Sequence, residues 1–169
     1  MYHHRKRTRL ACHNYSSPGY YFITVCTKDK KPLLCRIVGT DVLGGPKSEF
    51  TEAGILTEKQ LHSMASFYEQ ISIEKYVIMP NHVHLLLHIT REVNGPSGRP
   101  VPTNSIISSF IGTFKRFTNK AANTQLWQAR SYDHIVRDEH DFQRIWKYID
   151  ENPAKWAEDS LYCNEYTVE

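Results

Sequence analysis

The sequence predicts an α+β domain built around a mostly antiparallel sheet. Strand-like and helix-like segments follow one another in the order strand, helix, paired strands, helix, short connection, helix. Two strand-like segments, 71–79 and 82–89, are separated by only two residues, which suits a tight turn between adjacent strands. With 169 residues, 40% of them hydrophobic and 12% aromatic, the chain can bury one sizeable core but hardly two. We therefore expect a single domain over residues 1–169.

The first strand is expected at residues 20–27 and the first helix at 51–68, with no element assigned between them. Residues 20–27, YYFITVCT, are rich in β-branched and aromatic side chains, which favours a strand that is buried on at least one face. From Thr51 to Tyr68, apolar residues recur at helical spacing. Thr51 is a suitable N-cap for this helix.

The second half of the chain predicts a surface loop and two more helices. Residues 91–104 contain three prolines and two glycines, so we expect a surface loop that contributes nothing to the core. A helix over about 104–121 would bury one apolar face, made of Ile107, Phe110, Ile111, Phe114 and Phe117. The last helix should cover 139–151, because the residue before Pro153 resists helical geometry.

Charge and cysteine content restrict the class of protein. The formal net charge is only +3, but the segment 1–18 is basic, with Arg5, Lys6, Arg7 and Arg9 among its first ten residues. This placement favours a polyanionic partner, although a solvated terminus explains it equally well. No CxxC pair is present, so the cysteines are interpreted as reduced thiols. Neither a membrane span nor a signal peptide is indicated, and we expect a cytoplasmic protein.

Two histidines in the strand 82–89 are the first candidate site residues. His82 and His84 alternate with Val83, so both imidazoles project from one face of the strand while Val83 points to the core. We expect the histidine face to be exposed to solvent. Paired imidazoles can bind a divalent metal ion, but exposed histidines without a ligand are also common. His88 has the same parity and is expected to be peripheral.

The last helix supplies the second half of the candidate site. Its core stripe is formed by Phe142, Ile145, Trp146 and Ile149. Tyr148 and Asn152 lie beside this stripe, one helical turn apart, and would line the edge of a cleft. A half-buried tyrosine beside a helix-terminating asparagine explains either residue taken alone. Only coincidence with the histidine pair favours a functional site.

Four segments together resemble the REP-associated tyrosine transposases and related insertion-sequence transposases, which are single-tyrosine HUH endonucleases (U is a hydrophobic residue). They are GYYFITVCT at 19–27, MPNHVHLLL at 79–87, LWQARSYDHIVRD at 126–138 and YIDENP at 148–153. The resemblance covers almost the whole chain. It implies a ferredoxin-like, palm-type HUH domain whose helices pack on one face of the sheet.

The resemblance also implies roles for particular residues. His82 and His84 match the HUH metal motif, Tyr148 matches the nucleophile, and Asn152 matches the residue that completes the metal shell. Recurring family positions that would support the site are matched by Trp127, Gln128, Arg130, His134 and Arg137. The implied activity is metal-dependent cleavage and strand transfer of single-stranded or hairpin DNA through a 5′-phosphotyrosine, with Mg²⁺ or Mn²⁺ as the cofactor.

Contacts with DNA and the oligomeric state are less constrained. Backbone contacts are expected from Arg5, Lys6, Arg7 and Arg9 and from a second group on the helix 104–121, Lys115, Arg116 and Lys120. Aromatic residues such as Tyr20 or Tyr132 could stack on unpaired bases. Solvated helix faces and core aromatics explain these cations and rings nearly as well. A homodimer and a monomer are both compatible with the resemblance, since relatives of both kinds exist.

Two rival functions stay open at this point. One is a domesticated DNA-binding protein that has kept the fold but no longer cleaves DNA. The other is a metal-dependent hydrolase that uses His82 and His84, with His62 or His88 as a third ligand and water as the nucleophile. No general base for Tyr148 is evident in the sequence.

Overall fold

The computed structural model describes residues 17–41, 45–90 and 106–162. Its strands are β1 (Gly19–Cys26), β2 (Cys35–Asp41), β3 (Gly45–Phe50), β4 (Ile71–Met79), β5 (His82–Ile89) and β6 (Tyr132–Ile135). Its α-helices are α1 (Glu52–Met64), α2 (Ile106–Ala121) and α3 (Glu139–Glu151). Two short 3-10 turns, η1 (Lys28–Lys30) and η2 (Trp156–Glu158), complete the described elements.

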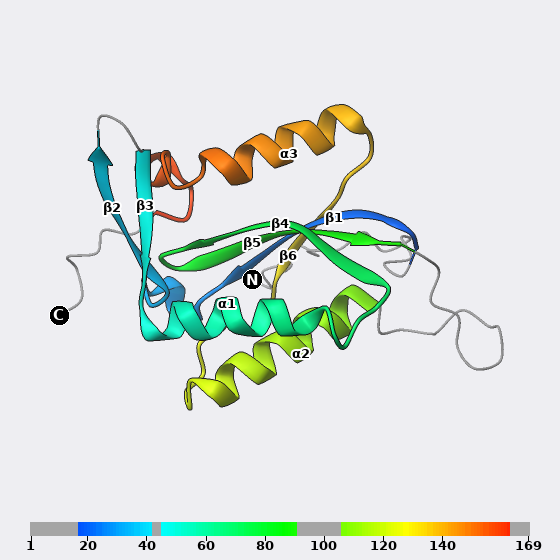
Figure 1. Cartoon of the computed structure of the whole chain (residues 1–169), viewed down its shortest axis with the longest axis horizontal. Helices are drawn as coiled ribbons and strands as arrows, with labels where there is room; N and C mark the ends of the chain where they lie inside the picture. The colour runs from blue at the N-terminus through cyan, green and yellow to red at the C-terminus, as the bar shows by residue number, and fades with distance from the viewer. Residues whose placement is uncertain (1–16, 42–44, 91–105, 163–169) are drawn as a thin grey trace, which may run out of the picture.

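The central sheet has four antiparallel strands in the order β4-β5-β1-β6 (Figure 1). β5 therefore lies between β4 and β1, where its backbone is paired on both sides. In this register His84 lies opposite Thr24 of β1 and Val77 of β4. β2 and β3 form a separate two-stranded sheet beside the central one.

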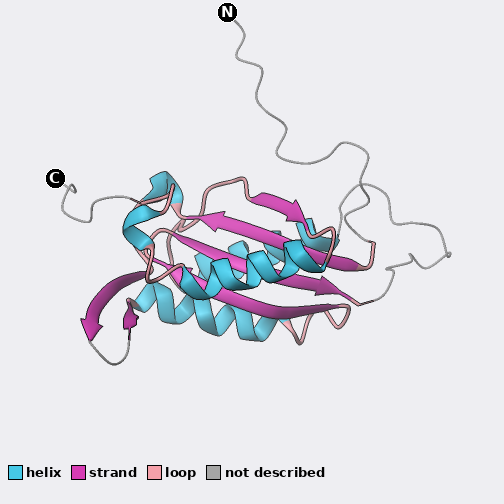
Figure 2. Cartoon of the chain, turned by 90° about the horizontal axis from the view of Figure 1, so that it is seen from above, coloured by secondary structure: helices cyan, strands magenta, loops and turns pink. Residues whose placement is uncertain are grey.

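Alternation along β1 and β5 produces two different buried layers. On one face, residues such as Ile23, Leu85 and Leu87 pack with the apolar sides of α1 and α2 in the larger core cluster. On the other face, Phe22 and Leu86 pack against Ile145 and Ile149 of α3. The sheet is thus covered by α1 and α2 on one side and by α3 on the other (Figures 1 and 2).

This layering confirms the predicted α+β class and the antiparallel sheet, and it corrects one detail. Helices cover both faces of the sheet, not one. The apolar stripe of α3 provides the reason, because Ile145 and Ile149 are 2% and 1% exposed and need apolar partners. Phe22 of β1 and Leu86 of β5, on the face opposite α1 and α2, supply such partners, so α3 packs there.

Most element boundaries agree with the sequence pattern. β4, β5 and α3 have the predicted bounds, and Thr51 caps α1 by accepting a hydrogen bond from the Gly54 backbone N–H at 3.1 Å. α1 ends at Met64, four residues earlier than predicted, because residues 65–67 form turns. The predicted loop 91–104 lies outside the described residues.

The hairpin β2–β3 and the short strand β6 were not predicted. β3 reads GPKSEF and is alternately exposed, so it has no apolar pattern to reveal it. β6 has only four residues and exists through its pairing with β1. Across the residues described, no helix is both long enough and apolar enough to cross a membrane.

Candidate metal and tyrosine site

The two histidines of β5 lie in the layer between the sheet and α3. His82 is 0% exposed and His84 is 3% exposed, so the expectation of a solvent-facing pair is wrong. The reason is that α3 and the segment after it cover this face of the sheet. The two imidazole centroids are 4.4 Å apart, and Phe22 stacks on His84 at 5.0 Å. The side chains around the pair therefore shield it from most of the solvent.

Hydrogen bonds orient both imidazoles through the same ring nitrogen. The His82 Nδ1–H donates to Asn81 Oδ1 at 2.8 Å, and His84 Nδ1 lies 2.9 Å from Thr24 Oγ1. The Asn81 oxygen can only accept, so the hydrogen of His82 is on Nδ1 and the lone pair of its Nε2 is available. The Thr24 hydroxyl can accept from His84 Nδ1 in the same way, which is how metal-binding histidines are commonly oriented. His82 Nε2 is buried and has no hydrogen-bond partner among the described residues. It could therefore serve as a ligand atom for a metal ion.

Burial keeps both imidazoles neutral. Loss of hydration lowers the pKa of His82 to about 4; the Asp159 carboxylate opposes this shift and the Lys30 ammonium adds to it. Burial, together with the neighbouring His82, holds the pKa of His84 well below its ordinary value of 6.5. Since a metal ion binds neutral imidazole, the pair is ready to coordinate one at neutral pH.

Tyr148 of α3 reaches this layer from the side. Its hydroxyl lies 3.3 Å from His84 Nε2 and donates to Asp159 Oδ2 at 3.1 Å. The residue is 40% exposed, as expected for a position beside the apolar stripe. Burial and the negative charge of Asp159 raise the pKa of Tyr148 to about 12. The phenol is therefore protonated at rest and must lose its proton to act as a nucleophile.

Asn152 ends α3 one turn after Tyr148 and is also buried, with 3% exposure. Its Nδ2 donates to Asp159 Oδ2 at 3.1 Å, while its Oδ1 has no partner in the described parts of the chain. Buried polar atoms normally have hydrogen-bond partners. The Asn152 Oδ1 atom and the His82 Nε2 atom are two such exceptions in one layer, which fits a site for a bound cation.

Asp159 is a site residue that the sequence analysis missed. It follows η2 and brings a carboxylate to both Tyr148 and Asn152, and its Oδ1 accepts the Leu161 backbone N–H at 2.6 Å. Ligand atoms of His82, His84 and Asp159 all lie within 4.8 Å of one another. No periodic pattern links residue 159 to the histidines, so only the path of the chain after α3 identifies it.

The supporting positions named from the resemblance are distributed over several places. Trp127 is buried in the larger core beside Phe114, on the opposite face of the sheet from Tyr148. His134 lines the cleft beside Tyr148 and bonds Asp141. The other three, Gln128, Arg130 and Arg137, have half-buried or exposed side chains and do not line that cleft.

The predicted DNA-contacting cations of α2 lie on the α1 and α2 side of the sheet. Lys115 Nζ donates to the backbone carbonyls of residues 128, 129 and 130 at 2.8, 3.4 and 3.1 Å, so it holds this loop in place. Arg116 and Lys120 are exposed, and a role for them in DNA binding stays a prediction. Four further predicted contacts lie outside the described residues: Arg5, Lys6, Arg7 and Arg9.

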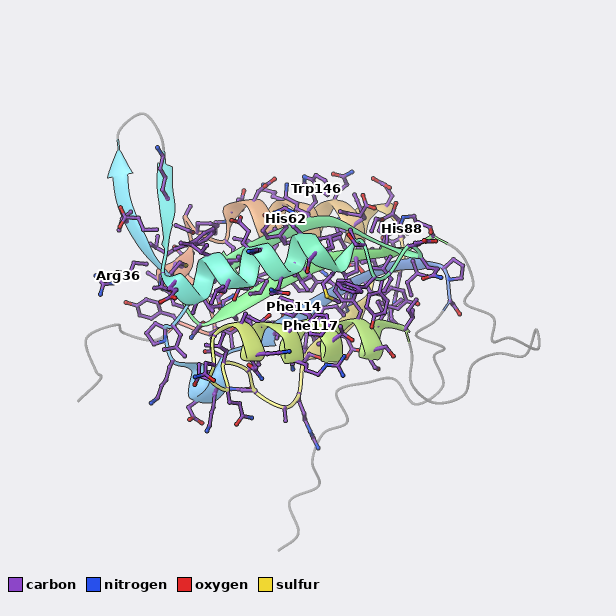
Figure 3. All side chains as sticks on the ribbon, turned by 60° about the horizontal axis from the view of Figure 1, so that its bottom comes forward. Arg36, His62, His88, Phe114, Phe117 and Trp146 are labelled. Carbon is purple, nitrogen blue, oxygen red and sulfur yellow. The ribbon has the colours of Figure 1, made fainter. Side chains whose placement is uncertain are left out.

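The two alternative third ligands of the hydrolase hypothesis are engaged elsewhere. His62 on α1 lies 3.2 Å from the Tyr76 hydroxyl, and His88 stacks on Tyr20 with centroids 4.2 Å apart. Figure 3 labels both histidines, His62 on α1 and His88 on β5. Neither belongs to the cluster of His82, His84 and Asp159. A metal ion at the histidine pair would therefore take its third protein ligand from Asn152 or Asp159.

Comparison with known proteins shows both a family and a fold. No family model matches the chain. An uncharacterized protein of Haemophilus influenzae is 33% identical over 177 residues, which cover 96% of this chain and 95% of the relative. The chain belongs to the same family as that protein.

A solved structure of a REP-associated tyrosine transposase bound to a REP hairpin has a TM-score of 0.61 and 20% identity, over 87% of this chain and 73% of that one. This likeness confirms the fold that the sequence resemblance predicted.

Proposed function

We propose that this chain, a member of the family of the Haemophilus influenzae protein with the fold of a REP-associated tyrosine transposase, is a metal-dependent single-strand DNA endonuclease and strand transferase. The observation that carries the proposal is the contact between Tyr148 and the histidine pair. A phenol 3.3 Å from a buried imidazole, beside unsatisfied ligand atoms, combines a nucleophile with a cation site. Hairpin or repeat DNA is the proposed substrate.

The ligand atoms fit a divalent cation. His82 and His84 would supply two nitrogens, and Asn152 Oδ1 or an Asp159 oxygen would supply the third protein ligand. A set of two imidazoles and one oxygen suits Mn²⁺, and Mg²⁺ is accepted where water and phosphate fill the other positions. The cation would supply positive charge at the non-bridging oxygens of the phosphate.

The reaction we propose begins at the Tyr148 hydroxyl. Its proton passes to Asp159 Oδ2, 3.1 Å away, and its oxygen forms a bond to phosphorus while the bond to the 3′ oxygen breaks. The departing 3′ oxygen takes a proton from water. The products are a 5′-phosphotyrosyl strand and a free 3′-OH. One phosphoester replaces another, so the 3′-OH of a second strand can reverse the step. No external energy source is needed.

The decisive experiment is covalent capture of DNA. We expect the full chain, incubated with Mn²⁺ and single-stranded oligonucleotides from the flanks of its own gene, to form a protein–DNA band that survives denaturation. Tyr148→Phe should abolish the band. Tyr162→Phe is the matched control, because Tyr162 is also exposed (44%) but contacts Trp156 and not the histidines. If no flank is captured by a folded protein that binds metal, the proposal is wrong.

The same variant separates the hydrolase hypothesis from the proposed function. A site that activates water needs the histidine pair but no phenol, so Tyr148→Phe would leave hydrolysis intact. A domesticated DNA-binding protein would instead bind the oligonucleotides without cleaving them. Gel analysis of released fragments, run beside the capture assay, distinguishes all three outcomes.

A further inference from the structure

Two hollows of different chemical character flank Tyr148. The larger has a volume of about 470 Å³ and is lined by Phe22, Thr24, Cys26, His84, Tyr132, His134, Arg144, Ile145, Tyr148, Ser160 and Leu161. The smaller, about 240 Å³, is lined by Tyr148, Glu151, Asn152, Lys155, Glu158, Asp159 and Ser160. Tyr148 and Ser160 belong to both, so the phenol stands at the boundary between them.

The larger hollow combines an exposed aromatic ring with a cation. Tyr132 on β6 is 55% exposed, so its ring is accessible to a ligand. Arg144 on α3 joins it in the lining. Among the described lining residues of this hollow none is acidic. A ring and a guanidinium in a cleft of this size match the two parts of a nucleotide, the base and the phosphate.

The Arg144 guanidinium is held in position by a carboxylate outside the cleft lining. Arg144 Nη2 donates to Asp141 Oδ1 at 2.6 Å, and Asp141 Oδ2 is 2.7 Å from His134 Nε2. A guanidinium has five N–H donors, so this ion pair leaves donors for a phosphate. His134 belongs to β6, the strand that carries Tyr132. Asp141 therefore links Arg144 to this strand.

The smaller hollow is acidic. It contains Glu151, Glu158 and Asp159, and the one basic residue among its described lining, Lys155, pairs with Glu151 Oε2 at 2.7 Å. In the metal-free protein, three carboxylates against one paired ammonium repel a polyanionic backbone. A DNA strand at Tyr148 is therefore directed to one side of the phenol.

We propose that the larger hollow binds one unpaired nucleotide next to the scissile phosphate, with its base stacked on Tyr132 and a phosphate on Arg144. This inference rests on the proposed function, because it needs a DNA strand at Tyr148. It adds which side of the phenol the strand occupies and which residues hold it. The acidic hollow stays free of DNA.

The test measures binding and not cleavage. Single-stranded oligonucleotides from the gene flanks, labelled with fluorescein, are titrated in EDTA with the full chain carrying Tyr148→Phe. Stacking of one base predicts that Tyr132→Ala weakens binding by about 5- to 150-fold and that Tyr132→Phe retains it. Phe67→Ala is the matched control, since Phe67 is 61% exposed and pairs with Phe117 on the α1 and α2 side. This control should leave binding unchanged.

A second readout isolates the phosphate contact. Arg144→Gln should reduce the slope of log affinity against log salt by about one, whereas Tyr132→Ala should leave that slope unchanged. Thermal unfolding confirms that each variant is folded. Unchanged affinity in Tyr132→Ala, or an unchanged slope in Arg144→Gln, would overturn the inference even if the wild type captures DNA covalently. Absence of covalent capture with both effects present would instead reject only the proposed chemistry.

Discussion

The middle of strand β5 is buried on both of its faces, but the two faces are chemically different. Val83, Leu85 and Leu87 of β5 are all 0% exposed and pack in the larger apolar core with α1 and α2. On the other face of the same strand, His82 is also 0% exposed and His84 is 3% exposed. Burial by itself therefore does not distinguish a core residue from a site residue. What distinguishes them is whether the buried atoms need a polar partner.

One face of β5 therefore contributes mainly to the stability of the fold, and the other face carries the candidate site. The α1 and α2 face is closed by apolar contacts, whereas the α3 face has only a small apolar cluster beside the polar atoms of the site. Because successive side chains alternate between faces, substitutions one residue apart in β5 should have different consequences. The predictions below use this contrast.

The largest effect is expected from the core side. Leu85→Ala should lower the free energy of unfolding by about 2–5 kcal/mol, because it leaves a cavity in a closed apolar layer. Chemical denaturation measures this loss of stability. Titration calorimetry measures how tightly the folded variant binds Mn²⁺. That binding should match the wild type. A loss of metal affinity in the folded protein would show that the two faces are coupled.

A smaller effect is expected from the site side. Thr24→Val removes the hydroxyl that lies 2.9 Å from His84 Nδ1 and keeps the shape of the side chain. Metal affinity should fall roughly 10- to 100-fold, as is typical when a histidine ligand loses its orienting partner. Calorimetry with Mn²⁺ measures the change. Thr118→Val is the control, since Thr118 is also fully buried and hydrogen-bonded but belongs to α2; equal losses in both variants would contradict the prediction.

The metal-free protein should lose stability in acid partly through the site. The folded pKa of His82, about 4, lies below its ordinary value of 6.5. As the pH falls from about 6.5 towards 4, the unfolded chain therefore binds a proton that the folded chain does not, so the free energy of unfolding falls. His84 acts in the same direction. Thermal unfolding in EDTA across this range measures the effect.

Replacement of the buried imidazole sharpens this pH prediction. His82→Asn should make the free energy of unfolding depend less on pH between 6.5 and 4, because the variant lacks the group whose pKa differs between the two states. His140→Asn, at an exposed position on α3, is the control and should leave the dependence unchanged. Parallel curves for the wild type and His82→Asn would show that His82 contributes nothing.

The smallest effect is expected on the outer surface of α2. Arg116→Ala and Lys120→Ala change exposed cations of α2. This helix lies on the opposite side of the sheet from α3, which carries Tyr148 (Figure 1). We expect covalent capture of a short single strand to be unchanged, and the free energy of unfolding to stay within about 0.5 kcal/mol. A fall in the salt slope of about one for a hairpin, but not for the short strand, would show that this surface contacts duplex DNA.

The sequence by itself determined the parts of the molecule that depend on local periodicity. Alternation placed His82 and His84 on the face opposite Val83, and the helical stripe placed Tyr148 and Asn152 at its edge. Both patterns hold in the structure because side-chain direction within a strand or helix is set by backbone geometry alone.

Only the tertiary structure decided which surfaces meet. The histidine pair is buried because α3 packs over it. Asp159 lies beside Tyr148 because of the path that the chain takes after η2. Lys115 donates hydrogen bonds to the backbone carbonyls of a loop. β6 likewise exists through pairing with β1, more than 100 residues earlier. Such contacts join segments that are distant in the chain, so no local pattern encodes them, and they form only when the packing of the whole domain is established.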